Sequence, residues 1–154
     1  MKKRITEDRL NDLSSQIIGM PVSHTWRGYG SAIFLEFGKL KKSDRSKNPK
    51  GEFTLAIEWS WRVENKRSIW FGSFSGNQKI SNQLPRLVGK TVKAVSLFGR
   101  LPEICLNLDN KHWVLSFATG EGQPEWALFL PDGSWCHVLN GVLYHENNKT
   151  EQQH

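Results

Sequence analysis

The sequence predicts an α+β fold dominated by antiparallel β-sheet, barrel-like or sandwich-like, built from two similar halves that each hold a helix and a meander. Three observations favour this class: many short segments alternate apolar with polar residues, turn residues separate them, and only two stretches have a helical pattern. The alternation is clearest over residues 52–74, where Phe53, Leu55, Ile57 and Trp59 share one strand face.

Residues 68–74 form a second apolar run after a polar segment of four residues, which is typical of a β-hairpin. We expect Trp61 opposite Trp70 and Trp59 opposite Gly72, with both pairs largely buried. A shift of one residue would turn these tryptophans to the other face, so the pattern favours a single register.

A helix is expected over residues 6–18. Thr6 suits the N-cap, acidic Glu7 and Asp8 follow in the first turn, and Gly19 suits the end. A shorter helix is expected over 81–88. Strands are expected, in chain order, over 22–27, 31–37, 91–98, 103–108, 111–118, 126–130, 135–139 and 142–145.

The order of these segments predicts an internal repeat of residues 6–77 and 78–145, followed by a frayed tail at 146–154. Two helical segments precede Gly19 and Gly89, and each is followed by a strand, a glycine turn and two further strands. Matching positions in the two halves are 70 residues apart before the glycine turn and 71 residues apart after it. Identities are few, and apolar alternation alone also produces such matches.

Length and composition favour one domain over residues 1–154. The chain is 38% hydrophobic and 23% charged, which is typical of a globular protein. Its apolar runs fall short of the roughly 18 residues of a spanning helix, and the N-terminal charges lack the apolar segment of a signal peptide. We therefore expect a cytoplasmic protein without membrane contact.

The net charge of +6 is unevenly distributed. Lys2, Lys3 and Arg4 begin the chain, and residues 39–50 carry six basic residues and Asp44, which leaves the remainder at −2. The 39–50 segment is rich in loop-forming residues, so a mobile exposed loop is predicted. The basic segments either solubilise the chain or contact an anionic surface such as nucleic acid. We favour the first interpretation.

No familiar catalytic or metal-binding motif is found. Residues 120–122 lack the third glycine and the helix of a dinucleotide-binding loop, and no HExxH or GxSxG occurs. Five histidines are scattered, and Cys105 and Cys136 lack metal-ligand spacing, so no metal and no cofactor is predicted. Cys136 and His137 are neighbours on a strand and point to opposite faces, which excludes them as nucleophile and base.

Charged residues within or beside the apolar strands are the candidate ligand-binding residues. They are Arg27, Glu58, Arg62, Arg100 and Glu103. Glu58 and Arg62 lie four apart on the strand face opposite the tryptophans. Arg27 and Arg100 adjoin equivalent turns of the predicted repeat, and Glu103 is placed to pair with Arg100. The alternative is a solvated outer face, and no catalytic residue is assigned.

Three long segments carry a family resemblance: GMPVSHTWRGYGSAIFLEFG, NPKGEFTLAIEWSWRVE and LFGRLPEICLNL. They resemble an uncharacterised bacterial protein family of about this length, and the resemblance covers most of the chain. The family has no established activity. The resemblance implies a bacterial, cytosolic, single-domain protein and transfers no catalytic residue.

Three functions stay open. The first expectation is a non-enzymatic binding or protein-interaction domain, of which an immunity-type partner of a secreted toxin is one version. The second is a small-ligand or enzymatic site within the sheet, which would require Glu58 in a concave pocket. The third is weak, sequence-independent nucleic-acid binding through the N-terminal tail and the 39–50 loop, which would require exposed tryptophans beside the loop. Specific nucleic-acid binding is not expected, because that loop contains no aromatic residue.

Overall fold

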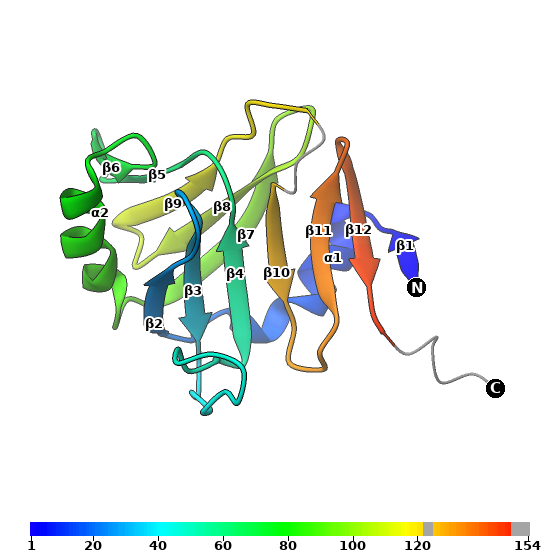
Figure 1. Cartoon of the computed structure of the whole chain (residues 1–154). Coiled ribbons are helices and arrows are strands. Elements are labelled where there is room, and N and C mark those ends of the chain that lie inside the picture. Colours follow the sequence, from blue (N-terminus) through cyan, green and yellow to red (C-terminus); the bar gives the residue numbers. More distant parts are fainter. Residues whose placement is uncertain (122–124, 149–154) are drawn as a thin grey trace.

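The computed structural model describes residues 1–121 and 125–148, and its elements are shown in Figure 1. Two antiparallel sheets form most of it, so the predicted α+β class is confirmed. The helical elements are α1 (Glu7–Leu13), η1 (Ser15–Ile17), α2 (Asn77–Gln83) and η2 (Leu84–Leu87). Thr6 caps α1 as expected, because its Oγ1 accepts a hydrogen bond from the Arg9 N–H at 3.2 Å. None of the helices within these ranges is both long and apolar enough to cross a membrane.

The larger sheet has seven strands in the order β1-β12-β11-β10-β4-β3-β2. Their bounds are β1 (Lys2–Arg4), β2 (Val22–Arg27), β3 (Ile33–Phe37), β4 (Phe53–Ile57), β10 (Trp126–Phe129), β11 (Trp135–Leu139) and β12 (Val142–Glu146). The smaller sheet has five strands in the order β6-β5-β9-β8-β7. Their bounds are β5 (Trp61–Glu64), β6 (Ile69–Gly72), β7 (Val92–Phe98), β8 (Glu103–Leu108) and β9 (His112–Ser116).

The two sheets lie face to face and share one hydrophobic core, so the fold is sandwich-like (Figure 1). Inward-facing residues of both sheets form this core, for example Leu35, Leu55 and Leu128 from the larger sheet and Val63 and Val114 from the smaller. The helices contact opposite edges of the smaller sheet: α1 contacts β7, while α2 contacts β6. This arrangement leaves the outer surface of the larger sheet uncovered by any described helix.

Equivalent segments of the two halves meet with reciprocal hydrogen bonds. The N–H of Gly19 donates to the carbonyl of Val92 at 2.8 Å, and the N–H of Gly89 donates to the carbonyl of Val22 at 2.8 Å. Both glycines have positive φ, at 91° and 94°, which ends the helical segment before each strand. Residues at matching positions of the predicted repeat are therefore in contact, and the repeat itself stays a prediction.

Each half also contributes strands to both sheets. After β4 the chain crosses to the smaller sheet as β5, and after β9 it crosses to the larger sheet as β10. Trp61 begins β5 and Trp126 begins β10, and both are buried. Their indole N–H groups donate to carbonyls in equivalent turns, at 2.7 Å to Ser31 and 3.2 Å to Pro102. The two tryptophans therefore have matching positions in the fold.

The predicted register of the tryptophan hairpin is wrong. The chain leaves the larger sheet after β4, so the alternating run is divided between two sheets and Trp59 is 52% exposed. An irregularity after Val63 shifts the ladder, and Val63 pairs with Phe71. Trp61 consequently packs edge-to-face against Phe71, with ring centroids 5.7 Å apart, in place of Trp70.

Both basic segments form backbone pairs that the sequence did not indicate. The N-terminal segment, called a tail from the sequence, forms β1 and pairs with β12. The 39–50 loop, called the basic loop below, is closed by an antiparallel bridge between Lys41 and Lys50, with N–H···O distances of 2.7 and 2.8 Å. The predicted frayed tail begins inside β12, which runs to Glu146, and residues 149–154 lie outside the described ranges.

Candidate functional site

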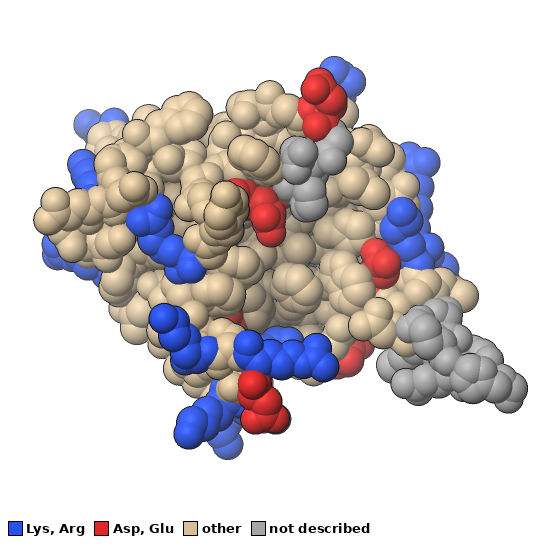
Figure 2. Space-filling model, in the orientation of Figure 1, with Lys and Arg blue, Asp and Glu red and all other residues tan. Residues whose placement is uncertain are grey.

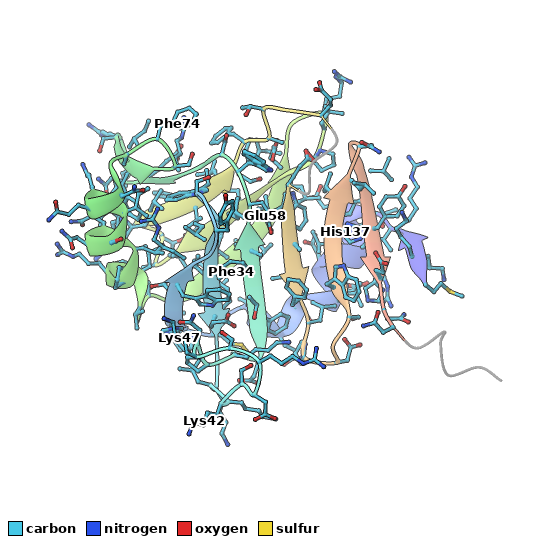
Figure 3. All side chains as sticks on the ribbon, viewed as in Figure 1. Phe34, Lys42, Lys47, Glu58, Phe74 and His137 are labelled. Atoms are coloured by element: carbon cyan, nitrogen blue, oxygen red, sulfur yellow. The ribbon has the colours of Figure 1, made fainter. Side chains whose placement is uncertain are left out.

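The outer surface of the larger sheet carries a band of rings. Alternation along its strands points the core residues inward and places every second side chain outward. The partly exposed outward rings, called the aromatic face below, are Trp26, Phe34, Phe129, Trp135, His137 and Tyr144. Figure 3 shows Phe34 and His137 on this one face, on either side of β4 and β10.

Trp26 and Phe34 form a tight parallel stack at one end of the aromatic face. They are cross-strand partners, with ring centroids 3.9 Å apart and planes inclined by 8°. The next residues in register are small: Ala56 lies beside Phe34, and Ala127 lies beside Ala56. The Phe34 ring therefore has Trp26 on one side and the small side chains of alanines on the other.

A buried carboxylate fixes this stack to the basic loop. Glu36 is only 2% exposed and accepts hydrogen bonds from the Trp26 indole N–H at 2.8 Å, the Gly51 N–H at 2.9 Å and the Thr54 hydroxyl at 2.5 Å. A buried carboxylate is stabilised when donors of this kind surround it. Glu36 thus positions both the tryptophan and the residue that follows the loop.

The basic loop folds back beside the aromatic face. A ring nitrogen of His24, Nε2, lies 3.0 Å from Asn48 Oδ1, which connects the loop to β2. Between the loop and the turn after β10 lies a cleft of about 680 Å³, within the usual size of ligand sites. Lys39, Lys41, Lys42 and Lys50 line it together with the carboxylate of Glu52. Figure 2 shows basic side chains gathered at this end of the face.

A smaller hollow of about 190 Å³ adjoins this cleft. Trp26, Phe34 and Phe129 form its ring-bearing walls. Ser43 and Lys50 line both spaces, so the lysine-lined cleft opens beside the hollow. Cations and flat apolar surfaces are therefore adjacent here.

The aromatic face continues to the edge strand β1. Ring centroids follow one another at 6.1 Å from Phe129 to Trp135, 6.5 Å to His137 and 5.8 Å to Tyr144. The ammonium of Lys2 lies 4.7 Å from the centre of the Tyr144 ring, a cation–π contact. The two basic segments of the chain thus border the same face, one at the end of its strands and one at its edge.

Two of the predicted site residues make local structural contacts. Arg27 holds the start of α2, since its guanidinium donates to Asn77 O at 3.2 Å, Asn77 Oδ1 at 3.1 Å and Ser81 Oγ at 3.0 Å. Arg62 lies on the outer surface of the smaller sheet, where its Nε is 2.6 Å from Glu64 Oε2 and its guanidinium covers the Phe117 ring at 4.7 Å.

The other three predicted site residues are Glu58, Arg100 and Glu103. They lie in links between strands or at a strand end, and none of them lines the cleft beside the basic loop. Glu58 is exposed in the link between β4 and β5, and Figure 3 shows it past the end of β4 that lies away from Lys42. Arg100 is exposed in the turn before β8. Glu103 accepts hydrogen bonds from the Ser116 hydroxyl at 2.6 Å and the Ala118 N–H at 2.8 Å. The five residues therefore do not assemble into one site.

Glu125 is the titratable group that stands out near Glu103. Its Oε2 is buried without a hydrogen-bond partner in the described part of the chain. Burial raises the pKa of the Glu125 carboxyl, and the negative charge of Glu103 adds to the rise. The adjoining hollow of about 200 Å³ lies beside Trp59, and no lysine or arginine of the described residues lines it.

The thiols and the remaining perturbed histidines lack the features of a reactive centre. Cys136 is fully buried, and desolvation raises its pKa to about 12. Desolvation also raises the pKa of Cys105 and lowers the pKa of His112 and His145. His137 lies on the outer surface opposite Cys136, as alternation along the strand requires. Among the described residues, no His, Cys, Asp and Glu side chains cluster so as to hold a metal ion.

Sequence reasoning missed most of the aromatic face. Trp26 is a strand tryptophan that such reasoning assigns to the core, and the extra residue at the irregularity between Val22 and His24 hides its outward direction. A usable signal exists in β11, where Trp135 and His137 alternate with buried Cys136 and Val138. This alternation indicates an aromatic surface only once the neighbours of β11 in the sheet are known.

Comparison with known proteins identifies no family: no protein-family model matches the chain, and neither a curated protein nor a solved structure shows significant similarity. The function is therefore inferred from the geometry alone.

Proposed function

We propose that this protein is a non-enzymatic binding domain whose contact surface is the aromatic face together with the basic loop. One observation carries the proposal: both basic segments of the chain border the same sheet surface, and that surface carries a band of partly exposed rings. Aromatic side chains bind partners strongly because they offer large rigid surfaces, and flanking cations attract anionic ligands.

The binding interpretation is also supported by how firmly the surface is held. Glu36 anchors Trp26 and Gly51, and the Lys41–Lys50 bridge closes the loop. A surface that is fixed before binding loses less conformational entropy when its partner arrives. The exposed position of Glu58 gives no support to the enzymatic alternative, which needs that carboxylate in a concave pocket.

An anionic partner is the consistent choice for this surface, and an immunity-type role would use it against an acidic protein. Among the described residues, four lysines and one carboxylate, that of Glu52, line the larger cleft. That carboxylate already accepts the Lys39 N–H at 2.7 Å. The cleft therefore keeps an excess of positive charge.

Chemical-shift mapping by NMR tests the proposal with two anionic probes, an oligothymidylate and a polyglutamate peptide. We expect at least one probe to shift amide resonances of β2–β4, β10–β12 and the basic loop, and to leave the outer surface of the smaller sheet unchanged. Shifts centred on β7 and β8, or no shifts with either probe, would show that this face is not a binding surface.

A further inference from the structure

We infer that the ligand of the aromatic face is single-stranded nucleic acid, with a base between Phe34 and Phe129 and adjacent phosphates on lysines of the basic loop. This inference rests on the proposed function and names its ligand class. Its basis is the junction of two spaces, one walled by rings and one lined by lysines, which share Ser43 and Lys50.

The ring-walled hollow has the requirements of a stacking site. Trp26 covers one side of the Phe34 ring at 3.9 Å, and the Glu36 carboxylate holds the Trp26 indole in place. On the opposite side of Phe34 the next residues in register are Ala56 and Ala127, and Phe129, two residues from Ala127 along β10, lines the same hollow. Aromatic side chains stack on any base, because every base has a flat π-surface.

The lysines of the cleft suit phosphates rather than base edges. Lys39, Lys41, Lys42 and Lys50 are all exposed, so their ammonium groups are free to follow a phosphate chain. Lysine binds phosphate as a point charge and lacks the two-pronged geometry with which arginine reads a particular group. Contacts of this kind position the strand and carry little sequence information.

A single strand fits this arrangement better than a duplex or an acidic peptide. A base reaches the hollow only when it is free of its own stack, as in single-stranded loops and ends. A duplex presents phosphates while its bases remain stacked. An acidic peptide supplies the charges without flat rings, so it leaves the hollow unused.

The sheet supplies the aromatic rings that the basic loop lacks. The loop has no aromatic residue of its own, which argued against base stacking from the sequence. The Trp26–Phe34 stack and Phe129 come from the sheet beneath, and the loop residues Asn48, Pro49 and Lys50 border the same hollow. The loop and the sheet together form the basic, aromatic-lined groove of sequence-tolerant single-strand binders.

Fluorescence anisotropy with a labelled oligothymidylate of about 12 nucleotides tests the inference. We expect Phe34→Ala to weaken binding about 5- to 150-fold, the usual effect of removing one stacking ring. Phe34→Leu keeps an apolar side chain without a flat ring and should also weaken binding, which covers the case in which the alanine variant folds poorly. Phe74→Ala is the matched control, because Phe74 is 96% exposed at the opposite end of the molecule (Figure 3).

The salt dependence of oligonucleotide binding tests whether the lysines of the basic loop contact phosphates. With four phosphates neutralised, affinity should fall about 50-fold between about 50 and 200 mM salt. The double variant Lys41→Gln/Lys42→Gln should flatten the slope of log affinity against log salt by about 1.4. Lys79→Gln/Lys93→Gln removes two exposed lysines from other elements and should leave the slope unchanged.

Three outcomes would overturn the inference, and they are distinguishable from one another. If polyglutamate displaces the oligonucleotide at equal charge concentration and Phe34→Leu binds normally, the face binds acidic polypeptides and only the ligand assignment fails. If neither probe binds at low salt, the proposed function fails with it. A duplex that binds as tightly as the single strand would likewise contradict base stacking.

Discussion

Pro21 and Thr91 lie opposite one another in an isolated antiparallel bridge, where the two segments that the predicted repeat makes equivalent meet. Reciprocal hydrogen bonds flank this bridge, from Val22 N–H to Lys90 O at 2.8 Å and from Val92 N–H to Met20 O at 2.9 Å. At the level of the sheets, residues 6–77 give three strands to the larger sheet and two to the smaller, and residues 78–146 give three strands to each.

The equivalence of Trp61 and Trp126 gives the first prediction. Both are buried where the chain crosses between sheets, so Trp61→Ala and Trp126→Ala should each lower the free energy of unfolding by about 3–5 kcal/mol. Urea denaturation measures the loss. Trp59→Ala is the control and should change stability by less than about 0.5 kcal/mol, because Trp59 is 52% exposed. If only one of the two substitutions lowered the free energy of unfolding, the result would argue against matching positions of Trp61 and Trp126 in the fold.

Glu36 should prove important for the loop as well as for stability. Glu36→Ala removes the acceptor of three donors, and leaving buried donors unpaired costs about 1–3 kcal/mol each in the absence of water. We expect a lower urea midpoint together with faster amide hydrogen exchange at Gly51. Glu52→Ala removes an exposed carboxylate with one backbone donor and should have a smaller effect. Equal effects of the two substitutions would contradict the anchoring role.

The pH dependence of stability should reveal Glu125. Burial raises its pKa in the folded state, so the folded protein takes up this proton more readily than the unfolded chain. The charged carboxylate therefore costs stability above the folded pKa, and the cost disappears as the pH falls below the unfolded pKa. Glu125→Gln should raise the melting temperature near neutral pH, and the gain should vanish in acid. A gain that persists unchanged in acid would point to packing instead of charge.

The cysteines should be poorly reactive in the folded protein. Only the thiolate attacks an alkylating reagent, and the pKa of Cys136 is raised to about 12. Cys105 is only partly buried and should react first. Mass spectrometry after iodoacetamide treatment near pH 8 should find Cys136 unmodified until denaturant is added. Rapid native labelling of Cys136 would show that its strand opens readily.

Local patterns in the sequence predict the individual elements well. The strands at 22–27, 103–108 and 135–139 match the expected ranges, because alternation and turn residues are local properties. The register of β5 and β6 could not be obtained in this way. It depends on the crossing of the chain between sheets after Ile57 and on the irregularity after Val63, and both are set by the packing of distant strands.

The candidate site was harder to predict than the fold. The basic segments are visible in the sequence, but the face between them is assembled from β1, β2–β4 and β10–β12, which come from three parts of the chain. Phe34 and Phe129 line one hollow only because β3 and β10 both pair with β4. Single charged residues such as Arg27 indicated local structure and not a binding site. In the case of Arg27, that structure is the attachment of α2.

Photocrosslinking to a single-stranded oligonucleotide that contains 5-bromouracil tests the central claim most directly, because the attached residue is identified by mass spectrometry. The account predicts crosslinks to the peptides that carry Trp26, Phe34 and Phe129, with loss of the Phe34 crosslink in Phe34→Leu. Tyr29 and Phe74 are the most exposed rings and serve as the internal comparison. Crosslinks confined to Tyr29 and Phe74, with none on the aromatic face, would contradict the account.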